Sequence, residues 1–492
     1  MKYLARNATW GAFSSAVRAA TGLSIALIAV RLLGGESYGQ MVTLLSLFVV
    51  YLALNSSLCT VLVTRLIRVA RTEPMCSEES VISAAILLTL LSIAALGFLT
   101  ILLWGVVSVI FSSASHGSDS IDAIRQGVIL MGVLTAVQIM NALHSAVIEA
   151  AGRLDLAMKW QLVGPLAVAT TLLFLLISKT PVSLPGYMVV LCCGAILDLL
   201  LLTVVRQRLM PLKVSLRFSA EKRQEIVVLL KSGTTLQAAS LMGIFLEPLN
   251  KFLLSHFAGA LAVTAYDLAM KLIWGIQSLF AGGMRVFLHL AREQGNTVSD
   301  AFYRVIALVL VPALALHVLA AVFLTWVAHY WVAMSDVEQI MIFFALATVS
   351  NLGMIYIMPA YNSLIGRGDL NFIFRSQSIV AITNIVASLV LIPFFGLLGA
   401  VFGLLCATAY NVAAIYRRHQ RVVGVGSGVS AVNLTRSGRF VFTMFVFCGA
   451  ILMGMGHAVN YYAVGIIFLA MTYVMKDDPL LAMLYARVKG SQ

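Results

Sequence analysis

The amino-acid sequence predicts an all-α, polytopic integral membrane protein with about 14 transmembrane helices. Three observations support this fold class: the composition, the spacing of the apolar stretches and the placement of the basic residues. Of the 492 residues, 61% are hydrophobic and only 11% are charged, and the mean hydropathy is +0.98. A soluble protein of this length could not bury so much apolar surface in one or two cores. Lipid is therefore the solvent that this composition fits.

The apolar stretches have the length of membrane spans. A spanning helix needs about 20 mostly apolar residues, because the hydrocarbon core of a bilayer is about 30 Å thick. The predicted spans are residues 9–32, 40–63, 82–108, 125–149, 158–178, 185–205, 230–255, 262–285, 303–327, 338–363, 372–392, 397–416, 439–457 and 459–475. Only the short turn 457–462 divides the last two, so 12 or 13 spans remain alternatives.

Arginine and lysine gather in every second loop, which predicts the orientation of the chain. The basic loops contain Arg65, Arg68, Arg71, Arg153, Lys159, Arg206, Arg208, Lys213, Arg217, Lys222, Arg223, Arg292, Arg367, Arg375, Arg417, Arg418, Arg421, Arg436 and Arg439. The positive-inside rule places these loops and both termini in the cytoplasm. Since the net charge of +13 is spread over many loops rather than one face, no nucleic-acid partner is expected.

A faint internal repeat predicts two lobes. Residues 152–155 (GRLD) follow the fourth span, and residues 366–369 (GRGD) follow the tenth span. A six-span unit has both ends on one side of the membrane, so its duplicate must run parallel to it. The predicted division is an N-terminal six-helix lobe (1–206), a cytoplasmic linker (207–228), a C-terminal six-helix lobe (229–418), and two additional helices with a cytoplasmic tail (419–492).

Ionisable residues inside the predicted spans are candidates for function, because each costs about 2.5–3.5 kcal/mol to insert. Arg18 lies near the middle of the first span and Asp198 lies in the sixth. The seventh and eighth spans carry two pairs at i,i+4 spacing, Glu247 with Lys251 and Asp267 with Lys271.

The turn between the seventh and eighth spans centres near Gly259. Lys251 and Asp267 are equally far from this turn, and so are Glu247 and Lys271. In an antiparallel helix pair such residues lie at similar depth. We therefore predict that Lys251 faces Asp267 and that Glu247 faces Lys271, in the half of the membrane away from the cytoplasm.

Two interpretations of these four residues, the charged quartet, stay open. In the first, the quartet is a neutral cluster that holds two helices together, because buried ion pairs compensate each other. In the second, Lys251 and Lys271 line a cavity with Arg18 and attract an anion. Glu247 and Asp267 would then position the lysines and bind a coupling proton or cation.

Several classes of function are disfavoured by missing motifs. The sequence has no GxxxxGK[ST] loop for nucleotide phosphates, no HExxH and no GxSxG. The six cysteines show no metal-ligand spacing, and the loops away from the cytoplasm are too short to hold a soluble active site. The chain is therefore not expected to be an enzyme, and no cofactor or metal site is expected.

Three segments carry a resemblance to a known family. Residues 29–39 read AVRLLGGESYG, which is similar to the end of the first helix in bacterial polysaccharide exporters. Residues 247–272, with EPLNKFLLS and AYDLAMKL, resemble the seventh and eighth helices of that family, and residues 366–400, ending in LIPFFGLLGA, resemble its eleventh and twelfth. The chain thus resembles the lipid-linked oligosaccharide (O-antigen and polysaccharide) flippases of the multidrug/oligosaccharidyl-lipid/polysaccharide exporter (MOP) superfamily. One departure is the basic Lys251 after Asn250, where the family often has an aspartate.

This resemblance implies two six-helix lobes around a central cavity and a transporter that works by alternating access. The cargo would be a polyprenyl-pyrophosphate-linked sugar repeat, flipped from the cytoplasmic to the periplasmic leaflet of the bacterial inner membrane for surface polysaccharide biosynthesis. Expected partners are this lipid-linked oligosaccharide, membrane lipids, a coupling proton or sodium ion, and a polysaccharide polymerase with its chain-length regulator. The proposed substrate-binding residues are Arg18, Lys251 and Lys271, with Glu247, Asp267 and Asp198 in charge pairing or ion coupling.

The alternatives are a multidrug or metabolite exporter of the same superfamily and a membrane-embedded polysaccharide polymerase or ligase. Cationic side chains in the cavity favour an anionic cargo over a cationic drug. Short loops away from the cytoplasm argue against a polymerase or ligase, which usually needs a large external loop.

Overall fold

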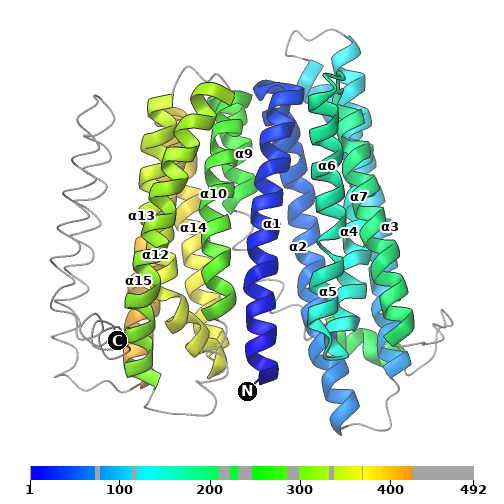
Figure 1. Cartoon of the computed structure of the whole chain (residues 1–492), viewed down its shortest axis with the longest axis vertical. Coiled ribbons are helices and arrows are strands. Elements are labelled where there is room, and N and C mark those ends of the chain that lie inside the picture. Colours follow the sequence, from blue (N-terminus) through cyan, green and yellow to red (C-terminus); the bar gives the residue numbers. More distant parts are fainter. Residues whose placement is uncertain are drawn as a thin grey trace, which may run out of the picture.

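The computed structural model is an all-helical bundle (Figure 1). It describes residues 2–72, 78–112, 118–209, 222–230, 246–284, 298–331, 337–367 and 369–423. No strand occurs in these ranges. The two C-terminal spans predicted at 439–457 and 459–475 lie outside the described residues.

The described helices fall into two successive sets along the chain. The first set is α1 (Lys2–Leu33), α2 (Gly35–Thr72), α3 (Glu78–Ser112), α4 (Ser118–Ala150), α5 (Leu154–Trp160), α6 (Val163–Ile177) and α7 (Leu184–Leu209). The second set is α9 (Leu246–Phe257), α10 (Ala260–Met284), α12 (Val298–Trp326), the π-helix η1 (Val327–Trp331), α13 (Val337–Gly366), α14 (Leu370–Phe395) and α15 (Leu397–Val423). Residues 222–230 are also helical.

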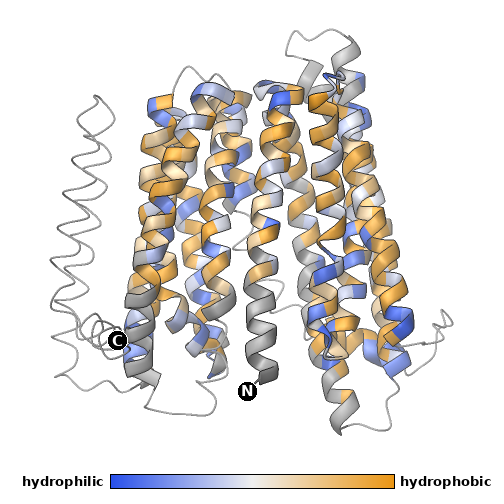
Figure 2. Ribbon diagram, in the orientation of Figure 1, coloured by the Kyte–Doolittle hydropathy of each residue, from blue (hydrophilic) through white to orange (hydrophobic). Residues whose placement is uncertain are grey.

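The bundle has the character of a polytopic membrane protein, as predicted. Within the described ranges, 9 helices are long and apolar enough to cross a membrane. Figure 2 shows apolar residues along much of their length. Helices suit this environment because lipid offers no hydrogen bonds, so each backbone N–H and C=O must be satisfied within the segment.

Helix contacts follow a corresponding pattern in the two sets. In the first set α7 packs against α4 and α6, and in the second set α15 packs against α13 and α14. Likewise α1 contacts α6, and α9 contacts α14. Contacts between the sets are made by α1 with α10 and by α2 with α9 and α10. The GRLD segment runs from the α4–α5 turn into the start of α5, and the GRGD segment begins at the last residue of α13.

The predicted fifth span is interrupted, which the hydropathy pattern alone did not reveal. It consists of α5 and α6, and the two helices are separated at Gln161 and Leu162. The proline ring of Pro165 explains the position of the break, since a proline clashes with the carbonyl four residues earlier, here that of Gln161, and cannot donate to it. The break leaves backbone N–H groups at the start of α6 that need other partners.

Gly399 and Gly403 serve helix packing within the chain. A Cβ at Gly399 would lie 2.4 Å from the backbone carbonyl of Leu391 on α14. A Cβ at Gly403 would lie 2.7 Å from the Ser388 hydroxyl. The GxxxG motif therefore lets α14 and α15 approach closely, as expected for small residues at membrane helix interfaces.

Two tight turns lie at the same end of the bundle, which we call the turn end. Gly34 joins α1 to α2 with φ +82°, and Gly259 joins α9 to α10 with φ +87°. Both turns are at the top of Figure 1, whereas the N-terminus lies at the opposite end. Glycine suits these positions because other residues rarely adopt a positive φ.

Candidate functional site

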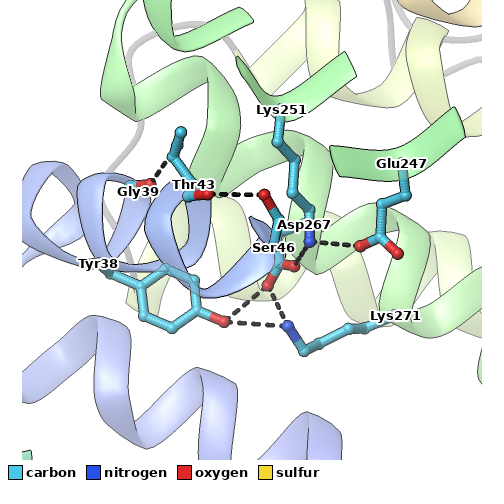
Figure 3. A network of polar contacts seen from close by, with 8 residues as sticks. All are labelled: Tyr38, Gly39, Thr43, Ser46, Glu247, Lys251, Asp267 and Lys271. Atoms are coloured by element: carbon cyan, nitrogen blue, oxygen red, sulfur yellow. Dashed lines mark hydrogen bonds and ion pairs between the residues drawn. The ribbon is translucent and has the colours of Figure 1, made fainter. Parts of the chain in front are cut away.

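The charged quartet is assembled by the hairpin of α9 and α10 (Figure 3). The Lys251 ammonium lies 2.7 Å from Oδ1 of Asp267 and donates a hydrogen bond to it. Their side chains are only 6% and 2% exposed. The predicted pairing of Lys251 with Asp267 across the Gly259 turn is confirmed.

The predicted pairing of Glu247 with Lys271 is wrong. Glu247 forms an ion pair with Lys251, and Lys271 forms one with Asp267. Both are i,i+4 contacts within one helix, a spacing at which a carboxylate and an ammonium are neighbours without any tertiary packing. Each lysine therefore keeps the acid of its own helix, and Asp267 is shared by both lysines.

Tyr38 on α2 completes the cluster and was not among the predicted site residues. Its hydroxyl donates a 2.7 Å hydrogen bond to Oδ2 of Asp267 and accepts one of 3.2 Å from the Lys271 ammonium. The ammonium also lies 5.8 Å from the centre of the Tyr38 ring. Tyr38 belongs to the AVRLLGGESYG segment, so the resemblance pointed to this segment but not to its partner. No spacing rule links residues 229 positions apart.

The two lysines differ in what remains available to a ligand. A lysine ammonium has three N–H donors and no acceptor. Lys251 contacts Glu247 and Asp267 and is almost fully buried. Lys271 contacts Asp267 and Tyr38, but its side chain is 34% exposed. Lys271 can therefore offer its remaining donor to an outside anion, while Lys251 is held inside the network.

Arg18 lies in a second polar cluster, at the break between α5 and α6. Its guanidinium donates to the side-chain carbonyl of Gln161, and it lies within the electrostatic field of Asp198 on α7. Asp198 in turn accepts a 2.6 Å hydrogen bond from the backbone N–H of Gly164 in the first turn of α6. The carboxylate thus satisfies a donor that the helix break leaves open, and it also suits the positive end of the helix dipole.

The structure does not join Arg18 to the two lysines by direct contact. Its described polar partners belong to the first helix set, whereas the lysines belong to the second. The two clusters are nevertheless on neighbouring helices, because α1 packs against α10. The two helices touch where Ala19 on α1 meets Gly275 on α10, since a Cβ at Gly275 would lie 3.3 Å from that of Ala19. Arg18 directly precedes Ala19, and Lys271 lies about one helical turn before Gly275.

The described part of the chain contains no group of three or more His, Cys, Asp or Glu side chains that could hold a metal ion. Each cluster places a cation beside a buried carboxylate: the exposed Arg18 lies near Asp198, and the partly exposed Lys271 pairs with Asp267.

No protein-family model matches the sequence, and no curated protein matches it significantly. Solved structures do match. The lipid II flippase MurJ in an inward closed conformation has a TM-score of 0.65 at 11% identity and covers 98% of each chain. An inward-facing multidrug resistance MATE family transporter of the MOP superfamily also has a TM-score of 0.65, at 13% identity, over 84% of this chain and 96% of that chain.

A further match is a MOP superfamily transporter from Pyrococcus furiosus, with a TM-score of 0.56 at 14% identity over 86% of this chain and 96% of that chain. The chain has the fold of these transporters. At such low identity the similarity extends to the fold alone, so the cargo must be argued from the residues of this chain.

Proposed function

We propose that this chain is a transporter that flips polyprenyl-pyrophosphate-linked oligosaccharide units from the cytoplasmic to the periplasmic leaflet of a bacterial inner membrane. It would work by alternating access and serve surface polysaccharide biosynthesis, including O-antigen or exopolysaccharide. The fold supports a transporter or flippase, since both kinds of protein are among the similar structures. The basic loops support cytoplasmic termini.

The observation that carries the choice of cargo is an asymmetry of exposure. The quartet contains two lysines and two acids, so its net charge is zero and cannot by itself favour an anion. However, the Lys271 side chain is 34% exposed while that of Asp267 is 2% exposed. Arg18 is likewise exposed while Asp198 is buried. In both clusters the most accessible charge is a cation: Lys271 is more exposed than Glu247, which is 23% exposed, and Arg18 is more exposed than Asp198, as an anionic headgroup would require.

A pyrophosphate carries several negative charges, and hydrocarbon is prohibitively unfavourable for it unless cations shield it. Arg18 and Lys271 would contact the phosphates, one from each helix set, across the α1–α10 interface. Lys251 would act from behind by holding Asp267. Glu247, Asp267 and Asp198 would position the cations and are the candidates for binding a coupling proton or sodium ion. The sugar would rest against polar side chains, while the polyprenyl tail stays in the bilayer.

The second candidate is export of drugs or metabolites, which the structural similarity to multidrug resistance transporters favours to the same degree. A cationic drug would have to approach Arg18 and Lys271 while the matching acids are buried. This geometry is unfavourable for a cation, because like charges repel and the acids are already neutralised. An anionic metabolite would meet no such obstacle. Experiment must therefore decide whether the cargo is an anionic metabolite or the lipid-linked oligosaccharide.

Leaflet analysis in cells without this gene tests the proposal. Radiolabelled sugar would be used to quantify polyprenyl-pyrophosphate-linked units and to determine which leaflet holds them. We expect single units to accumulate on the cytoplasmic leaflet and surface polymer to be lost. Normal transfer without polymer would instead indicate a polymerase or ligase, and normal transfer with normal polymer would indicate small-molecule export.

A further inference from the structure

Several hydrogen bonds connect the two helix sets near the turn end. Besides the bonds of Tyr38 to Asp267 and Lys271, the Thr264 hydroxyl on α10 donates to the backbone carbonyl of Gly35 on α2. The indole N–H of Trp331 donates a 2.8 Å bond to the carbonyl of Leu27 on α1. In each of these bonds the partner on α1 or α2 lies within about three helical turns of Gly34.

Backbone packing reinforces the same junction. A Cβ at Gly39 would lie 1.9 Å from the carbonyl oxygen of Ala260, so α2 and the start of α10 approach as closely as glycine permits. Tyr38, the neighbouring residue, is 2% exposed. Asp267 is also 2% exposed, so the hydrogen bond from Tyr38 to this carboxylate is shielded from water and contributes more than one in water.

We propose that Tyr38, Asp267 and Lys271 form a lock that holds the two helix sets together at the turn end, and that this lock opens when the transporter exposes its cargo there. This inference deepens the proposed function, on which its role in transport rests, by naming the gate. The orientation predicted from the basic loops puts this gate on the side away from the cytoplasm.

The chemistry of the three groups suits a reversible lock. Tyr38 supplies one hydroxyl, which both donates to Asp267 and accepts from Lys271, so both described hydrogen bonds between the sets in this network pass through a single atom. When the sets separate, Asp267 keeps Lys251 and Lys271 as partners on its own hairpin. No charge is then left unpaired. Opening costs the Tyr38 hydrogen bonds but not a buried ion pair, whose rupture would be far more expensive.

The lock can be tested without any cargo, by measuring the separation of the two sets at the turn end. Spin labels would be placed on Thr180→Cys after α6 and Phe257→Cys at the end of α9, in a cysteine-free background of the full chain in nanodiscs. Both positions are exposed and belong to different helix sets. Pulsed electron–electron double resonance then gives the populations of short and long distances between the two spin labels.

The decisive variant is Tyr38→Phe, which removes the hydroxyl and keeps the ring. Its matched control is Tyr266→Phe, because Tyr266 on α10 is about as buried as Tyr38, but none of the described hydrogen bonds links it to the first helix set. We expect Tyr38→Phe to raise the ratio of long to short distances about tenfold or more, the size expected for a hydrogen bond to a charged group, and Tyr266→Phe to match the parent.

An unchanged distribution in Tyr38→Phe, or an equal shift in both variants, would overturn the lock. If Tyr38→Phe does not yield a monodisperse protein, Thr264→Val provides the test. It removes the bond to the Gly35 carbonyl and is expected to shift the distribution in the same direction by a smaller factor. Because cargo is absent from this experiment, its failure would refute the lock without refuting the flippase proposal. Loss of transfer in cells tests the latter independently.

Discussion

The hydroxyl of Tyr38 on α2 donates a 2.7 Å hydrogen bond to the carboxylate of Asp267 on α10, a residue that also neutralises two lysines. One buried aspartate thus supports both the cohesion of the α9–α10 hairpin and its attachment to the first helix set. The two interpretations of the charged quartet, structural cluster and anion site, then apply to different members. Lys251 fits the first, and Lys271 fits the second.

Removal of the shared acid is expected to be the most damaging change in the cluster. Asp267→Asn leaves Lys251 and Lys271 without their common carboxylate, and breaking a buried ion pair from one side costs about 3–5 kcal/mol. We expect a large loss of folded protein, measured by thermal denaturation with fluorescence-detected size exclusion. Glu247→Gln is the control, because Glu247 is 23% exposed and Lys251 keeps Asp267. Equal stability of the two variants would contradict this assignment.

The two lysines should separate stability from transport. Lys251→Gln removes the almost fully buried ammonium that pairs with both Glu247 and Asp267, and it should reduce folded protein. Lys271→Gln should fold, since Asp267 keeps Lys251, but should lose export. Surface polymer in complemented cells and protein level in the membrane measure the two effects, with the exposed loop residue Lys179→Gln as the charge control. Normal export in Lys271→Gln would remove this residue from the anion site.

Arg18 should be required as a planar, multi-donor cation rather than as a charge alone. Arg18→Gln should abolish export and Arg18→Lys should restore only part of it, because lysine cannot reproduce the bidentate geometry that suits phosphates. Arg208→Gln, at the exposed end of α7, removes the same charge away from the cluster. If Arg18→Lys exports as well as the parent, a phosphate-specific role for Arg18 is excluded.

Helices α6 and α7 pack closely next to the helix break at Gln161. A Cβ at Gly164 would lie 2.4 Å from the Gly194 carbonyl oxygen and 2.6 Å from Cγ of Asp198. Gly164→Ala should therefore lower the melting temperature. In contrast, Gly22→Ala meets no atom within 4 Å and should stabilise α1 slightly, by about 0.5–1 kcal/mol at most. If Gly164→Ala melts at the same temperature as the parent, α6 and α7 can move apart without loss of stability.

Gly39 offers a steric test of the turn end that is independent of hydrogen bonds. Because Gly39→Ala would place a methyl group against the Ala260 carbonyl, it should push α2 and α10 apart. The reaction of a water-soluble thiol reagent with a cysteine introduced near this junction should become faster than in the parent and in Gly22→Ala. Unchanged accessibility would mean that the two sets do not need this close approach.

The sequence predicted the helices well, because membrane burial imposes one strong rule: a span must be apolar and must satisfy its own backbone. It also predicted Lys251 with Asp267, since a hairpin with a glycine turn fixes depth. It did not predict the partner of Lys271. The local i,i+4 contact and the tertiary contact compete on similar terms, and hydropathy contains no information about which is preferred.

The contribution of Tyr38 could not be predicted for a different reason. Its partner comes from a helix 229 positions away, and the contact depends on how two helix sets dock rather than on any local pattern. Likewise, a proline such as Pro165 can break a helix wherever it occurs, but the sequence does not indicate that Asp198 satisfies the freed start of α6. Both relationships need the tertiary packing of α2 on α10 and of α6 on α7.

The most direct test of the central claim uses the purified chain in proteoliposomes with a fluorescent polyprenyl-pyrophosphate-linked sugar. A membrane-impermeant reagent that modifies the headgroup reports which leaflet holds it. We expect chain-dependent transfer of the headgroup across the bilayer, which is lost in Lys271→Gln and kept in Lys179→Gln. Absence of transfer by a chain that does export a cationic dye from the same vesicles would contradict the flippase assignment and identify a drug exporter.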